Sequence, residues 1–218
     1  DLDRLMTRTQ RRPMAMKVLS PLEAVIFALV CGASGITLLG LVFEGLVPAL
    51  LGVIALLLYA FVYTPLKRVN SIAVFVGAIP GAMPPLIGWA AATGSLSTEA
   101  LALFLIQFLW QFPHFWAIAW VLEDDYNKAG FKMLPANAGR SAFTASIILV
   151  YTLLMVPVAI LPFSLGMSGW ITSIVIAIAG AGFAAQALLL LRTRTIKSAS
   201  RLMFGSFIYL PVVQIAML

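Results

Sequence analysis

The sequence predicts an all-α fold, a multi-pass transmembrane helical bundle with seven spans. Of its 218 residues, 62% are hydrophobic and only 10% are charged, and the mean hydropathy is +1.04. Soluble domains carry roughly 25% charged residues. Long uncharged stretches match the helix of about 20 residues that crosses a bilayer. These observations exclude a water-soluble globule and a disordered chain, and the single cysteine excludes a disulfide scaffold.

The spans follow from the uncharged stretches, taken in order along the chain. One stretch, Ser141–Leu191, is too long for one helix, and the segment from Pro162 to Gly169 divides it. The predicted spans are residues 22–43, 46–63, 72–92, 100–121, 142–161, 170–191 and 202–218. No soluble domain fits between them, so residues 1–218 are expected to form one integral-membrane domain. The chain opens inside a charged loop without an initiator methionine, and we expect its N-terminal helices to be missing.

The basic residues predict the orientation of the bundle. If the spans alternate in direction, all fourteen Lys and Arg lie on one face, in the opening segment and after spans two, four and six. The opposite connections carry only Glu44 and Glu99. Basic residues in short loops mark the cytoplasmic side, or the matrix side in a mitochondrion. Topology therefore accounts for the pI of 9.8, and the predicted partner is the lipid bilayer, with no nucleic acid.

Two groups of carboxylates lie among these basic residues. Asp1 and Asp3 stand in the opening segment, and Glu123, Asp124 and Asp125 follow the fourth span. Mg²⁺ binds proteins through one or two carboxylates together with substrate phosphates, and arginine binds phosphate oxygens in pairs. The pattern favours a polyanionic ligand held partly through Mg²⁺. The alternative is that the acidic residues only pair with neighbouring basic residues in solvated loops.

Polar residues also occur inside the predicted spans. Gln107, Gln111 and His114 share one stripe of the fourth span, which continues to Asp125. Such residues usually face a cavity or the bundle interior, so the stripe indicates either a ligand site or hydrogen bonds between helices. Pro80, Pro84 and Pro85 predict a break in the third span, or a kink in a packing helix. The second span ends with Tyr63, Lys67 and Arg68. These residues either contact a ligand or anchor the helix at the membrane surface.

Four segments give the chain a specific resemblance. They are DLDRLMTRTQRRP at 1–13, YTPLKR at 63–68, GAIPGAMPPLIGW at 77–89 and LWQFPHFWAIAWVLEDDYNKAGFKMLP at 109–135. Together they resemble the haem O synthases (protohaem IX farnesyltransferases), a branch of the UbiA-type intramembrane prenyltransferases. The last segment is specific to the haem branch. The resemblance implies nine transmembrane helices around a central cavity, of which the seven spans here would be the third to the ninth.

The resemblance also implies a reaction and roles for residues. Farnesyl diphosphate would donate its farnesyl group to a vinyl group of protohaem IX (haem b), water would add, and haem A synthase would use the product. Members of the family carry two acidic motifs. In this sequence Asp3 matches the last aspartate of the first motif, and Arg8 and Arg12 match its arginines. The second motif matches Glu123–Asp125. The implied roles are Mg²⁺ binding by Asp3, Asp124 and Asp125, with Asp1 and Glu123 as further ligands; diphosphate binding by Arg8, Arg12, Tyr63, Lys67, Arg68 and Lys128; and acceptor binding by Gln107, Gln111 and His114.

Two alternatives remain at this point. Another prenyltransferase of the same superfamily would act on an aromatic quinone precursor or a chlorin. A transporter would also use a broken helix and polar residues at the membrane midplane. The charges gather on one predicted face, which favours a reaction chamber open to that face. The expected location is a bacterial inner membrane or the mitochondrial inner membrane, with the site facing the cytoplasm or the matrix.

Overall fold

The computed structural model describes residues 2–42 and 45–217, so the candidates Asp1 and Glu44 lie outside the described residues. Within them the fold is all-helical, as predicted. The long helices are α1 (Pro21–Val42), α2 (Leu46–Leu57), α4 (Ala73–Thr93), α5 (Thr98–Val121), α7 (Ala142–Ala159), α9 (Trp170–Thr193) and α10 (Ile196–Ala216). The short helices are α3 (Thr64–Leu66), α6 (Glu123–Lys128) and α8 (Leu161–Ser164), with 3₁₀ turns at Leu2–Arg4 and Pro135–Asn137 and a π-helical stretch at Leu58–Tyr63.

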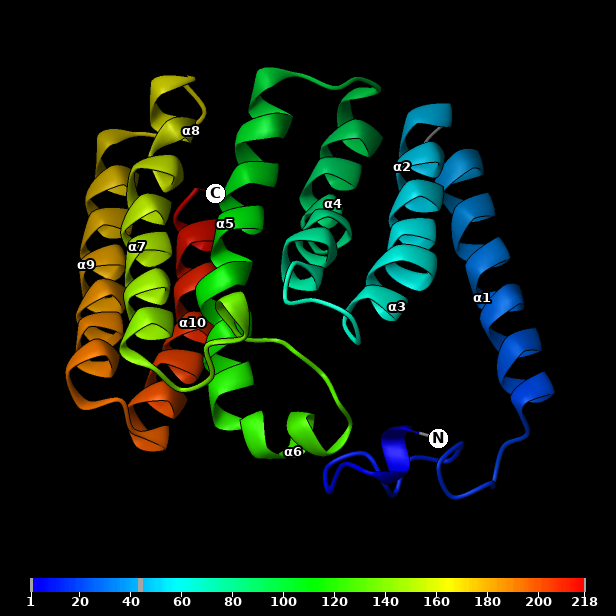
Figure 1. Ribbon diagram of the computed structural model, residues 1–218. Helices are drawn as coiled ribbons and strands as arrows, with labels where there is room; N and C mark the ends of the chain where they lie inside the picture. Colours follow the sequence, from blue (N-terminus) through cyan, green and yellow to red (C-terminus); the bar gives the residue numbers. More distant parts are fainter. Residues whose placement is uncertain (1, 43–44, 218) are drawn as a thin grey trace.

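Helix α5 lies at the centre of the bundle. It packs against α4 on one side and against α7 and α10 on the other, and α9 completes a four-helix group with α5, α7 and α10 (Figure 1). On the side of α4 the helices form a row, in which α2 packs on α4 and α1 packs on α2. The largest buried side chains, Trp116, Trp120 and Phe112, all come from α5. This helix therefore supplies much of the core.

In the part of the chain that the structure describes, seven helical segments are long and apolar enough to cross a membrane, which confirms the predicted number of spans. The chain is an integral membrane protein. The last span begins at Ile196, six residues before the predicted position at 202. The difference arises because Thr195 caps this helix: its hydroxyl accepts a hydrogen bond from Ser198 N at 3.1 Å, and Ser198 Oγ accepts one from Thr195 N at 3.3 Å. A capping signal starts the helix before the uncharged stretch begins.

The predicted break in the third span is wrong, because α4 runs without interruption from Ala73 to Thr93. Pro80, Pro84 and Pro85 each remove one backbone donor, two of them at adjacent positions, but the helix continues because it packs between α2 and α5. The fourth span likewise continues through Pro113. Packing against neighbouring helices outweighs the local preference of proline here.

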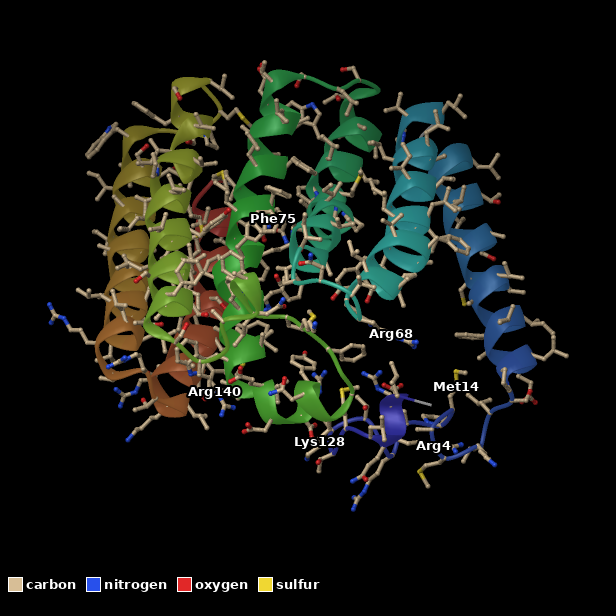
Figure 2. All side chains as sticks on the ribbon, viewed as in Figure 1. Arg4, Met14, Arg68, Phe75, Lys128 and Arg140 are labelled. Atoms are coloured by element: carbon tan, nitrogen blue, oxygen red, sulfur yellow. The ribbon has the colours of Figure 1, made fainter. Side chains whose placement is uncertain are left out.

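The connections that carry the lysines and arginines lie together at one end of the bundle. They are the opening segment, the link from α3 to α4, the chain between α5 and α7, and the link from α9 to α10 (Figure 1). Figure 2 shows Arg4, Arg68, Lys128 and Arg140 at this end. We call it the basic end.

Candidate functional site

Asp125 joins the opening segment to α6 at the basic end. Its Oδ1 accepts a hydrogen bond from Thr7 N at 3.0 Å, and its Oδ2 accepts one from Arg8 N at 3.2 Å. Lys128 Nζ lies 3.2 Å from Oδ1 and also donates to Thr7 Oγ1 at 3.3 Å. The hydrogen bond from Thr7 N, followed by the one from Arg8 N, lowers the pKa of Asp125 to about 2. The two predicted acidic motifs thus meet in space.

Asp3 lies on a 3₁₀ turn at the start of this segment, whereas the resemblance placed its motif on a long helix. Its backbone carbonyl accepts a hydrogen bond from Thr9 Oγ1 at 2.8 Å, and Arg12 Nη1 lies 3.3 Å from its Oδ2. These contacts fold residues 3–12 back on themselves. Met6 packs on Phe131 in the loop after α6, which seats the segment on the bundle.

Lys67 lies where the second span reaches the basic end. Its ammonium group is 5.5 Å from the centre of the Tyr63 ring and 5.3 Å from that of Phe131, so it contacts aromatic rings on two sides. Burial lowers the pKa of Lys67; the charge of Asp3 opposes this effect, and those of Arg68 and Arg12 add to it. The structure thus brings Asp3, Arg68 and Arg12 into electrostatic range of Lys67.

Arg140 is a component of this end that the sequence analysis did not select. Its Nε donates to the carbonyl of Trp120 at 2.8 Å and lies 3.2 Å from Glu123 Oε2, and its Nη2 donates to Asp124 Oδ2 at 3.0 Å. Trp120 is in the last turn of α5, where carbonyls have no partner within the helix. Arg140 therefore fixes the second acidic motif to the end of α5. Its only signal in the sequence was its place among the basic residues.

The arrangement of carboxylates bears on the expected Mg²⁺. Among residues 2–42 and 45–217, no three acidic, histidine or cysteine side chains gather closely enough to hold a metal alone. A Mg²⁺ bound by one or two carboxylates and by diphosphate oxygens needs no such group. Asp3 suits this role because its side chain is 36% exposed and its partner in the ion pair is the exposed side chain of Arg12. Both oxygens of Asp125 already accept backbone hydrogen bonds, and Asp124 is paired with Arg140.

A cavity of about 110 Å³ lies between the π-helical stretch Leu58–Tyr63, α4 and α5, and one of its lining residues, Tyr63, contacts Lys67. Its lining is mostly aromatic and apolar, with Gln111 as a polar member: Tyr59, Tyr63, Val74, Gly77, Gly81, Gln111, Phe115 and Met133. Gly77 permits the close approach of Tyr63, because a Cβ at Gly77 would lie 2.6 Å from the tyrosine ring. We call this space the α4–α5 cavity. Charged groups at its mouth and aromatic groups inside it suit a ligand with an anionic head and an apolar body.

The predicted polar stripe on α5 divides between two neighbouring helices. Gln111 Nε2 donates to the carbonyl of Ala78 on α4 at 2.9 Å and to that of Gln107 at 3.3 Å. His114 Nδ1 lies 2.7 Å from Ser206 Oγ on α10. Residues three apart differ by about 60° around a helix, so members of one stripe can contact different neighbouring helices. Gln107 contributes its carbonyl to this arrangement.

His114 makes hydrogen bonds within the bundle. Ser206 Oγ donates to the carbonyl of Met203 at 2.5 Å, so this hydroxyl accepts from Nδ1–H of His114. Trp110 stacks on the imidazole, with ring centres 4.4 Å apart, and donates from its indole nitrogen to the carbonyl of Ser206 at 2.9 Å. These contacts join α5 to α10, as expected if the polar residues of α5 form hydrogen bonds between helices.

Comparisons with known proteins identify the family. The sequence profile of the UbiA prenyltransferase family matches residues 1–210. The chain belongs to this family. A protein of Cytophaga hutchinsonii named protoheme IX farnesyltransferase is 51% identical over 98% of this chain and 74% of its own length. Relatives with the same name from Flavobacterium psychrophilum and Gloeobacter violaceus are 43% and 40% identical, over 99% and 100% of this chain and 72% and 71% of their lengths.

The UbiA fold is also supported by a solved structure. A structure described as that of digeranylgeranylglyceryl phosphate synthase in membranes matches with a TM-score of 0.78 at 21% identity, covering 99% of this chain and 77% of that one. This match supports the all-helical bundle. The resemblance predicted from the four sequence segments is confirmed, and the chain is a prenyltransferase.

Proposed function

We propose that this UbiA family member transfers the farnesyl group of farnesyl diphosphate to a vinyl group of protohaem IX (haem b) and so makes haem O. The observation that carries the proposal is the match, at 51% identity over 98% of the chain, to a relative named protoheme IX farnesyltransferase. The geometry supports it, because a charged site opens onto an aromatic cavity between helices. Residues 1–218 act as one integral-membrane domain in this proposal.

The basic end binds the diphosphate. Asp3 and Arg68 lie within electrostatic range of Lys67, and Lys128 and the backbone of Arg8 are bound to Asp125. Positive charge here stabilises the negative charge that develops on the leaving group. The assigned diphosphate contacts are Arg8, Arg12, Tyr63, Lys67, Arg68 and Lys128.

Mg²⁺, when bound, supplies Lewis-acid stabilisation of the leaving diphosphate. Asp3 is assigned as its main carboxylate, with Asp124 and Asp125, and with Asp1 and Glu123 as further candidates. Asp125 has a second role, because its hydrogen bonds to the opening segment bring Arg8 to the site.

The acceptor side is assigned to α5. The mostly aromatic and apolar lining of the α4–α5 cavity keeps bulk water away from the apolar chain, which protects an allylic cation from premature hydrolysis. Gln111 lines this cavity, Gln107 orients Gln111, and His114 is assigned a place near the porphyrin. The basic end faces the cytoplasm of a bacterial inner membrane, and haem A synthase consumes the product.

Membranes that carry the protein test the proposal when they are incubated with farnesyl diphosphate, haem b and Mg²⁺. We expect haem O by mass spectrometry, and loss of turnover in Asp3→Ala and Asp125→Ala with membrane insertion retained. Glu99→Ala is the control, since Glu99 starts α5 at the opposite end of the bundle. Prenylation of an aromatic acid in place of haem b would overturn the proposal.

A further inference from the structure

Gln111 has a fixed orientation and an unused hydrogen-bond acceptor. The residue is 2% exposed. Both of its amide hydrogen bonds come from Nε2, to the carbonyls of Ala78 and Gln107, and these bonds hold the side-chain plane in place. Its Oε1 accepts no hydrogen bond from any residue that the structure describes, so this oxygen is free to accept one from a bound molecule.

This oxygen lies against Gly81 of α4, beside the α4–α5 cavity. Gln111 and Gly81 both line the cavity, and Oε1 lies where a side chain on Gly81 would begin. The volume of about 110 Å³ exceeds what one water molecule needs, which is about 10–15 Å³ on the same kind of measure. The other lining side chains are mainly aromatic and aliphatic. A small hydrogen-bond donor would therefore bind at Oε1 in preference to elsewhere on the wall.

We propose that Gln111 Oε1 holds the water molecule that adds to the acceptor after prenyl transfer. This inference rests on the proposed function. It follows from three observations together: the amide held in place by its two hydrogen bonds, its oxygen with a free acceptor position, and the cavity lined by Tyr63, whose ring Lys67 contacts. Gln111 thus determines which product forms.

The electrons balance in four steps. The C1–O bond of farnesyl diphosphate breaks, and both electrons leave with the diphosphate. The π electrons of the porphyrin vinyl group form the new carbon–carbon bond from its outer carbon, which leaves a cation on the inner carbon. Water held by Gln111 gives a lone pair to this carbon and forms the C–O bond. The proton released from that water passes to the diphosphate, whose charge rose when it left.

A competing fate of the same cation provides the test. If no oriented water is present, the cation loses a proton and gives an alkene. In membranes that carry the protein, we expect the wild type to give the hydroxylated product, labelled with ¹⁸O when the reaction runs in H₂¹⁸O. In Gln111→Leu the ratio of alkene to alcohol should rise about tenfold, which corresponds to the loss of one hydrogen bond in the water-addition step.

The chain offers a matched control. Gln186 on α9 has a buried Oε1 without a partner in the described part of the chain, and it packs against Gly205 on α10, outside the cavity lining. Gln186→Leu should leave the product ratio unchanged. Gly81→Ala, which displaces Oε1 while keeping Gln111, should raise the ratio, whereas Gly88→Ala should not, because open space surrounds Gly88.

Each outcome decides the inference. A wild-type product ratio in both Gln111→Leu and Gly81→Ala overturns it. An equal rise in Gln186→Leu also overturns it, because a general loss of packing would then explain the shift. If Gln111→Leu loses all turnover, the ratio in Gly81→Ala decides. Absence of any farnesylated porphyrin from the wild type would instead refute the proposed function.

Discussion

Replacement of Arg140 by Gln should loosen the junction between α5 and α6. The substitution removes the charged hydrogen bond from Nε to the Trp120 carbonyl at 2.8 Å, which is worth about 1.5–3 kcal/mol. It also removes the ion pair with Glu123 at 3.2 Å, worth about 0.5–1 kcal/mol for partly exposed groups. The pair with Asp124 adds little, because that side chain is 75% exposed. The total is about 2–4 kcal/mol of local stability.

Amide hydrogen exchange measures this loss directly. Every 1.4 kcal/mol is a factor of ten, so protection of the amides in residues 122–128 should fall about 30-fold to 700-fold. Arg140→Lys should recover part of it, since lysine keeps the charge without the planar fork. Arg201→Gln is the control, because Arg201 is an exposed arginine of α10. Unchanged protection in Arg140→Gln, or an equal loss in Arg201→Gln, would refute the reasoning.

Three further predictions concern the opening segment, the diphosphate contacts and α4. The pKa of Asp125 is lowered from its usual 3.8 to about 2. Its hydrogen bonds to the backbone N–H groups of Thr7 and Arg8 should therefore persist above pH 3.8 and be lost as the pH falls through about 2. Hydrogen exchange rates of these two amides, measured against pH, will show whether this window is correct. In Asp125→Asn the same amides should exchange faster already at neutral pH, and slow exchange there would count against the contact. The double substitution of Lys67→Ala and Arg68→Ala removes charged contacts and should raise the KM for farnesyl diphosphate at least about tenfold. An unchanged KM would contradict the assignment of these residues. Gly77→Ala should lower the free energy of unfolding by about 1–3 kcal/mol, because its Cβ would meet the Tyr63 ring. Gly88→Ala should be neutral or stabilising, because no atom of the described residues lies near its Cβ. Equal effects of the two substitutions in thermal unfolding would contradict this account.

The number and direction of the spans were predictable because they depend on local properties. An uncharged stretch either has the length of a membrane helix or does not, and basic residues mark its end wherever it packs. The proline-rich span shows where local reasoning fails. Pro80, Pro84 and Pro85 weaken a helix in isolation, but the packing of α4 between two neighbours depends on residues far away in the sequence.

The contacts of the site were less predictable than its composition. Asp125 was selected from its motif, yet its partners are the backbone N–H groups of Thr7 and Arg8, and every residue type except proline carries such a group. The divergence of Gln111 and His114 depends on which helices flank α5. Arg140 was overlooked because its two kinds of partner, carbonyls at a helix end and carboxylates on the next turn, meet only in three dimensions.

The bond between Thr7 and Asp125 joins residues 118 positions apart in the chain. At about 5–20 residues per second, a ribosome needs roughly 6 to 24 seconds to travel that distance. During this interval the nascent opening segment has no carboxylate to seat it, and the leaving-group pocket is incomplete. The opening segment therefore takes its final contacts only after α5 and α6 have been synthesised.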